Sequence, residues 1–121
     1  VLRIGAGKQF RALAPAGRGP TGPISHHASL VVDDFDPDRI QGVLESYGVT
    51  PRGDAQGADG PLQSYVTMRM PNRGGAPGGT PELYFTDPDG ILIQLQDARY
   101  CGGNGYLGEE CGTTENPTGR V

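Results

Sequence analysis

Four polar side chains recur at alternate positions around one short turn, and their types could support chemistry. Glu82 and Tyr84 precede the turn, while Gln94 and Gln96 follow it. Alternate residues of a β-strand point to one face, so a half-buried hairpin would present all four together. A glutamate there can act as a general base or metal ligand. We take Glu82 and Tyr84 as candidate catalytic residues; the alternative is that both are ordinary residues of a sheet surface.

Tyr65 and Arg69 lie on one face of a second expected strand, over residues 62–70. A tyrosine hydroxyl and a guanidinium can bind an anionic or phenolic ligand. The amide of Gln94 can fix a substrate in the same way, or simply hold a strand. We therefore predict Tyr65, Arg69 and Gln94 as ligand-binding residues, with ordinary sheet-surface positions as the alternative for the tyrosine and the arginine.

The turn that separates these polar pairs has a clear local cause. In Asp87-Pro88-Asp89-Gly90, the proline presets φ at the second turn position and the glycine accepts a positive φ. Apolar residues alternate with the polar ones on both sides of this turn. Residues 82–96 are therefore predicted to form a β-hairpin with one face toward a core.

One convincing helix is predicted over residues 37–47. Asp36 suits the N-cap, Pro37 the first helical position, and Gly48 a left-handed C-cap. Apolar residues recur inside these limits at helical spacing, which gives one stripe toward a core. These residues are Ile40, Val43, Leu44 and Tyr47.

The remaining elements indicate an α+β fold. We expect a strand over residues 24–32, a short strand over 49–52, the strand over 62–70 and then a Gly-rich loop over 71–81. Residues 1–14 are predicted to form an additional hairpin, 15–23 a linker, and 98–121 an irregular tail. A sheet with one helix buries only one face well, so the other needs a partner unit.

Composition limits the classes of function. The chain has 121 residues, which suits one domain, and its 21 Gly and 11 Pro predict much turn and loop. A net charge of −4 without a basic cluster argues against nucleic acid, and no apolar run reaches the roughly 20 residues that span a bilayer. The start at Val1 is typical of a processed, trimmed or engineered product. The expected partner is a small-molecule ligand.

Two cysteines, Cys101 and Cys111, lie in a Gly-rich segment. The favoured interpretation is a disulfide, which implies an oxidising compartment such as the periplasm or the extracellular space. Two unpaired thiols, as in a cytoplasmic protein, are the next interpretation. A redox pair comes last, because no basic residue or helix start lies nearby to lower a thiol pKa.

Residues 27–35, the helix after them and residues 84–95 together resemble the vicinal oxygen chelate superfamily of glyoxalases, bleomycin-resistance proteins and extradiol dioxygenases. The resemblance implies a βαβββ module over residues 24–97 that pairs with a second module around a metal or ligand cavity. Residues 1–14 look like the closing hairpin of a preceding module, most of which this chain lacks. It also implies a homo-oligomer, in which a second copy supplies the missing module.

In metal-using members, each module supplies a histidine from its first strand and a glutamate from its last. These positions fall on His27 and Gln94 here, with His26 as the rival if the strand shifts by one residue. Alternation favours His27 toward the cavity and places His26 on the helix side. Glu82 could add a carboxylate. The expected cofactor is a divalent ion of iron, manganese, zinc or nickel. A metal-free site is the alternative, because a glutamine is a weaker metal ligand than a glutamate.

Three functions follow from the resemblance. A metal-dependent lyase or dioxygenase would polarise vicinal oxygens of its substrate. A bleomycin-resistance-like protein would bind a small aromatic molecule without metal. A structural module would use the open sheet for assembly.

Overall fold

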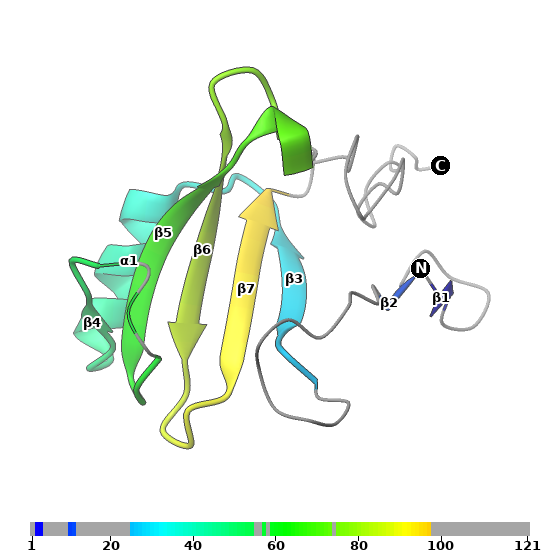
Figure 1. Ribbon diagram of the computed structural model, residues 1–121. Helices are drawn as coiled ribbons and strands as arrows, with labels where there is room; N and C mark the ends of the chain where they lie inside the picture. The colour runs from blue at the N-terminus through cyan, green and yellow to red at the C-terminus, as the bar shows by residue number, and fades with distance from the viewer. Residues whose placement is uncertain are drawn as a thin grey trace.

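A computed structural model describes residues 2–3, 10–11, 25–54, 57, 59–73 and 75–97 of the chain. Over these residues the fold is α+β with one α-helix, as predicted, and the strands form a five-stranded mixed sheet (Figure 1). The predicted linker over 15–23, the tail over 98–121 and the disulfide between Cys101 and Cys111 lie outside the described residues. No helix of the described part is long and apolar enough to cross a membrane.

The helices and strands follow in the order β1 (Leu2–Arg3), β2 (Phe10–Arg11), β3 (Ala28–Val32), α1 (Pro37–Ser46), β4 (Thr50–Pro51), β5 (Gln63–Arg69), the 3-10 helix η1 (Pro71–Arg73), β6 (Thr80–Thr86) and β7 (Leu92–Asp97). Strands β1 and β2 pair antiparallel within the segment expected to form the N-terminal hairpin. The main sheet has the order β3-β7-β6-β5-β4. Its two outer pairs, β3 with β7 and β4 with β5, are parallel, and the inner pairs are antiparallel.

Helix α1 begins and ends where its capping residues predict. The Asp36 carboxylate accepts a hydrogen bond from the backbone N–H of Arg39 at 3.0 Å, which satisfies one free donor of the first turn. Gly48 has a φ of 87°, and its N–H donates to the Glu45 carbonyl at 2.9 Å. The helix is one residue shorter than predicted, since Tyr47 is its C-cap.

The turn between β6 and β7 confirms the predicted hairpin. The Asp87 carboxylate accepts hydrogen bonds from the N–H groups of Asp89 at 2.9 Å and Ile91 at 2.8 Å. Gly90 has the positive φ, 81°, that the turn requires. The register that results puts Tyr84 opposite Gln94.

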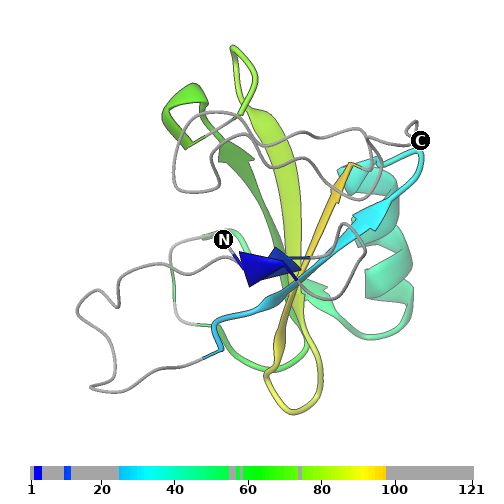
Figure 2. The same ribbon diagram turned by 90° about the vertical axis from the view of Figure 1, so that its right-hand side faces the viewer.

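Strand register separates the side chains of the sheet into two sets. Leu83 lies opposite Val66 on one side and Leu95 on the other, so these three share a face. Helix α1 covers part of this face, where the Gln41 amide donates to the Ser64 hydroxyl at 3.1 Å. Figures 1 and 2 show α1 on one side of the sheet only. The alternate residues face the other way.

The first strand of the sheet is shorter than predicted. Strand β3 begins at Ala28, whereas the sequence suggested a strand from residue 24. Its neighbour β7 begins at Leu92, directly after the turn, and pairs Ile93 with Ala28. Residues before His27 would therefore extend past the end of the partner strand, where no backbone group is available for pairing.

Candidate functional site

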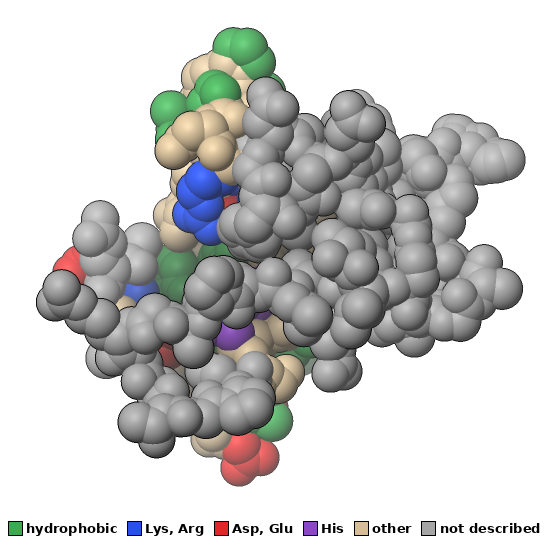
Figure 3. Space-filling view, turned by 45° about the vertical axis from the view of Figure 1, so that its right-hand side comes forward, with side chains coloured by type: hydrophobic (Ala, Val, Ile, Leu, Met, Phe, Trp, Pro, Cys, Tyr) green, Lys and Arg blue, Asp and Glu red, His purple; other side chains and the backbone are tan. Residues whose placement is uncertain are grey.

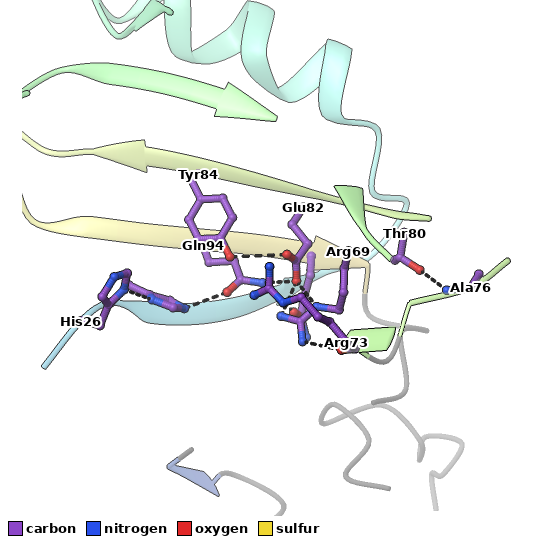
Figure 4. Close-up of polar contacts among 10 residues, drawn as sticks. His26, Arg69, Arg73, Ala76, Thr80, Glu82, Tyr84 and Gln94 are labelled. Carbon is purple, nitrogen blue, oxygen red and sulfur yellow. Dashed lines mark hydrogen bonds and ion pairs between the residues drawn. The ribbon is translucent and has the colours of Figure 1, made fainter. Parts of the chain in front are cut away.

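All the predicted site residues lie on the face of the sheet away from α1, which we call the polar face. It is built from His27 beside β3, Tyr65 and Arg69 of β5, Glu82 and Tyr84 of β6, and Gln94 of β7. In Figure 4, dashed lines join the labelled side chains Arg69, Glu82, Tyr84 and Gln94 in one connected group across the sheet, with α1 at the top of the view. Histidine and basic side chains are visible on this side of the molecule in Figure 3.

Arg69 and Glu82 form a buried ion pair at one end of the polar face. The Nε and Nη2 atoms of Arg69 each lie 2.5 Å from Oε1 of Glu82, and both side chains are almost fully buried. Arg69 also donates to the Arg73 carbonyl at 3.4 Å. A buried charge needs a partner, and here each charge has one. The Glu82 carboxylate, a candidate base, is thereby already engaged.

Gln94 connects this ion pair to the rest of the face. Its Nε2 lies 2.8 Å from Oε1 of Glu82 and 3.0 Å from Oε1 of Gln96. A carboxylate only accepts hydrogen bonds, so the amide nitrogen must face Glu82 and the amide oxygen must face the other way. The ion pair therefore determines which end of the Gln94 amide is offered to His27.

His27 donates a hydrogen bond from Nε2 to Oε1 of Gln94 over 2.9 Å. Burial lowers the pKa of His27 below its usual 6.5, and the neighbouring His26 and Arg69 act in the same direction. The bond to Gln94 and the charge of Glu82 oppose this shift of the pKa without reversing it. His27 is therefore neutral at pH 7, with its proton on Nε2 and a lone pair on Nδ1.

An aromatic row crosses the strands beside these polar groups. The ring of Tyr84 stacks on that of Tyr65, with centroids 5.2 Å apart and an interplanar angle of 11°. His27 meets Tyr84 edge to face at 5.6 Å, and the Arg52 guanidinium lies 4.0 Å from the Tyr65 ring centroid. These distances are typical of favourable aromatic and cation–π contacts. Within this row Tyr84 is buried and Tyr65 is half-buried.

The hydroxyl of Tyr65 remains protonated under physiological conditions. Burial raises its pKa above 10.0, and the charge of Asp59 raises it further, while Arg52 partly opposes both. Arg52 itself is paired with Asp59 at 2.8 Å. The hydroxyl donates its proton to the Asp59 carboxylate, so it is already engaged. Sequence reasoning did not include Arg52 and Asp59 in the site, because Arg52 ends a short expected strand and Asp59 lies in a loop.

The residues of the polar face do not fit a divalent cation in this arrangement. The predicted ligands His27 and Gln94 are hydrogen-bonded to each other, and Nε2 of the histidine carries the proton that a metal would have to replace. Glu82 is held by Arg69 and by the Gln94 amide. Within the described residues, no three His, Cys, Asp or Glu side chains come together as a metal-binding group.

His26, the alternative to His27 at the family's histidine position, lies elsewhere than predicted. Alternation placed His26 on the helix side, but its Nδ1 lies 2.7 Å from Nδ1 of His27. Strand geometry does not govern this residue, because β3 begins at Ala28. Gln96, which the period of two had placed on the polar face, is the further member that sequence reasoning left out of the site.

Comparisons of the chain with protein-family models, with curated proteins and with solved structures find no match. Function must therefore be inferred from the chemistry of the polar face. That face contains a neutral histidine, an engaged carboxylate, a protonated tyrosine and stacked rings.

Proposed function

We propose that residues 24–97 form a βαβββ module of the vicinal oxygen chelate type, and that its polar face binds a small aromatic ligand with a phenolic or anionic group, without a metal ion. The element order and the sheet order β3-β7-β6-β5 support the module, with α1 crossing on one face. His27 and Gln94 occupy the family's ligand positions on the opposite face.

The hydrogen-bonded chain from Arg69 through Glu82 and Gln94 to His27 carries the metal-free part of the proposal. Every contact in it joins a donor to an acceptor, and its central residues are buried. Such a chain holds its side chains in one arrangement before a ligand arrives. Preorganisation of this kind favours binding, because little conformational entropy is then lost.

The nearby rings indicate the chemical class of the ligand. The half-buried ring of Tyr65, backed by the buried ring of Tyr84, supplies aromatic surface, which favours a planar ligand. The Arg52 guanidinium, 4.0 Å from the Tyr65 ring centroid, favours a ligand with a phenolic or anionic oxygen. Small aromatic acids and phenols satisfy both requirements.

Calorimetric titration with para-nitrophenol, catechol and benzoate tests the proposal. We expect saturable binding of at least one compound to the metal-free protein, weakened about three- to tenfold by Tyr65→Leu, as for loss of one aromatic contact. Tyr47→Leu is the matched control, since Tyr47 is exposed at the end of α1 and its replacement should leave affinity unchanged. Binding by none of the three, or equal losses in both variants, would refute the proposal.

A metal-dependent lyase or dioxygenase is the second candidate: three potential ligands lie close together, and each would have to give up a hydrogen bond of the present arrangement to bind a metal ion. His27, Gln94 and Glu82 are linked by contacts of 2.9 and 2.8 Å. Elemental analysis of protein purified without chelators or affinity tags decides between the candidates. Near-stoichiometric iron, manganese, zinc or nickel that disappears in His27→Ala would establish the enzyme; wild-type protein without metal, even after incubation with each ion, would favour the binding module.

We also propose that the protein self-associates through the helix side of the sheet. On the helix side of the sheet, Leu30 is 55% exposed and Met68 is 48% exposed. Apolar surface of this kind is a frequent site of protein contact. Sedimentation velocity over a wide concentration range should show a dimer or larger species. A monomer at every concentration would refute self-association and with it the structural-assembly function.

A further inference from the structure

The two adjacent histidines end the hydrogen-bonded chain at the surface of the molecule. His27 is half-buried and His26 is exposed, and their rings meet edge to face with centroids 5.0 Å apart. We propose that Nε2 of His26 is the nitrogen that meets the ligand, where it accepts a hydrogen bond from a phenolic hydroxyl, and that His27 is a positioning residue. The ligand part rests on the proposed function, whereas the assignment of nitrogens does not.

The ion pair at one end of the hydrogen-bonded chain decides which groups donate and which accept along it. Glu82 accepts from Arg69 and from the Gln94 amide nitrogen, which leaves the Gln94 oxygen to face Nε2 of His27 at 2.9 Å. An oxygen acceptor requires that Nε2 carry the proton. In a neutral imidazole the other nitrogen then has the lone pair, so Nδ1 of His27 is an acceptor.

The same rule assigns the proton of His26. Its Nδ1 lies 2.7 Å from Nδ1 of His27, and a hydrogen bond this short needs one donor and one acceptor. Since Nδ1 of His27 accepts, Nδ1 of His26 donates, and the lone pair of His26 is on Nε2.

Exposure decides which nitrogen a ligand can reach. Both nitrogens of His27 are engaged, one by Gln94 and one by His26. Nε2 of His26 belongs to an exposed ring beside the histidine that contacts Tyr84. A ring that stacks near the tyrosines can therefore direct a hydroxyl to this lone pair. A phenol matches because it combines an aromatic ring with an acidic O–H group.

Nitrogen-15 NMR of the full chain tests the assignment without any ligand. The chain has two histidines, so variants identify each signal. We expect the Nδ1–H tautomer for His26 and the Nε2–H tautomer for His27 in slightly alkaline buffer. In His27→Asn, His26 should return to the Nε2–H form that free imidazole side chains favour. A His26 already in that form in the wild type would overturn the proposal.

Diethyl pyrocarbonate, which acylates unprotonated imidazole nitrogens, gives an independent readout by ultraviolet absorbance. We expect one rapidly modified histidine in the wild type, and a fast phase that disappears in His26→Asn but persists in His27→Asn. Because His26 is exposed, its replacement should leave the unfolding midpoint unchanged. Fast modification that survives in His26→Asn would show that His27 offers the reactive nitrogen and would contradict the proposal.

Calorimetry with para-nitrophenol then separates the two proposals. With the expected tautomers, His26→Asn should weaken binding about three- to tenfold, as for one lost hydrogen bond. Unchanged affinity in that variant would refute the ligand role of His26 while leaving the binding function intact. A wild type that binds no phenol would refute both that ligand role and the proposed phenol binding. The tautomers seen by NMR would still decide which nitrogen of each histidine donates and which accepts.

Discussion

On the helix side of the sheet, apolar side chains remain open to solvent, whereas charged and amide side chains are buried on the polar face. Leu30 keeps 55% of its surface exposed, and no residue of α1 is buried. Glu82 and Gln94, in contrast, are each 2% exposed. Buried charged residues are unusual unless they are paired, and Glu82 is paired with Arg69.

Hydrogen bonds hold most of the largest fully buried side chains, on both faces of the sheet. Of the largest fully buried side chains, Leu83 alone is apolar, and the others are Gln94, Thr86 and Ser64. Thr86 accepts from the Gln63 N–H at 3.0 Å, and Ser64 accepts from Gln41, so these groups are satisfied. Hydrogen-bonded polar networks of this kind define one arrangement of side chains more strictly than apolar contacts do.

The largest expected effect comes from breaking the buried ion pair. Arg69→Met leaves the Glu82 carboxylate buried without its cation, which should destabilise the fold by about 3–5 kcal/mol. Urea unfolding measures this loss. The double variant Arg69→Met/Glu82→Leu should recover much of it, because no uncompensated charge remains. Arg39→Met on exposed α1 is the control; equal losses at Arg39 and Arg69 would contradict the special role of the pair.

A pair of leucine substitutions compares the two sides directly. Leu83→Ala should destabilise the fold by about 2–5 kcal/mol, because Leu83 is fully buried. Leu30→Ala removes a side chain that is more than half exposed, and its effect should stay within about 0.5 kcal/mol. Thermal and urea unfolding at low protein concentration give both values. A large loss at Leu30 would show that another copy covers the helix side in solution.

Loss of the helix N-cap should have a smaller effect. Asp36→Ala removes the acceptor for the Arg39 N–H, and it should destabilise the fold by about 1 kcal/mol. Asp36→Asn keeps an acceptor and should be close to the wild type. Circular dichroism during urea unfolding measures both. If the alanine variant is as stable as the wild type, α1 contributes little to the cooperative unfolding of the protein.

The smallest expected effect is a pH dependence from His27. Because its pKa is lowered in the folded state, the unfolded chain binds more protons just below pH 6.5. Stability should therefore fall as the pH decreases through 6.5 and should level off once the folded state is protonated too. His26, Arg69 and Glu82 are the charged or titratable groups near the ring. His27→Asn should reduce this slope, and an unchanged slope would assign it to other groups.

Local sequence was sufficient to predict several elements of the fold. Asp36 and Gly48 define the two ends of α1, and the Asp87–Gly90 turn places Tyr84 opposite Gln94. These features depend on backbone preferences and hydrogen bonds between residues close in the chain, so one sequence contains the required information. The start of β3 was not predictable in this way, because it depends on where β7 begins.

The sequence by itself determined which residues share the polar face, because alternation along each strand is a local property. The tertiary structure decided what those residues do to one another. Only the position of β7 between β3 and β6 brings Gln94 into contact with both His27 and Glu82. The charge of Arg69 then fixes Glu82, Glu82 orients the Gln94 amide, and the amide sets the proton on His27. That order depends on distances between strands, which spacing along the chain does not contain.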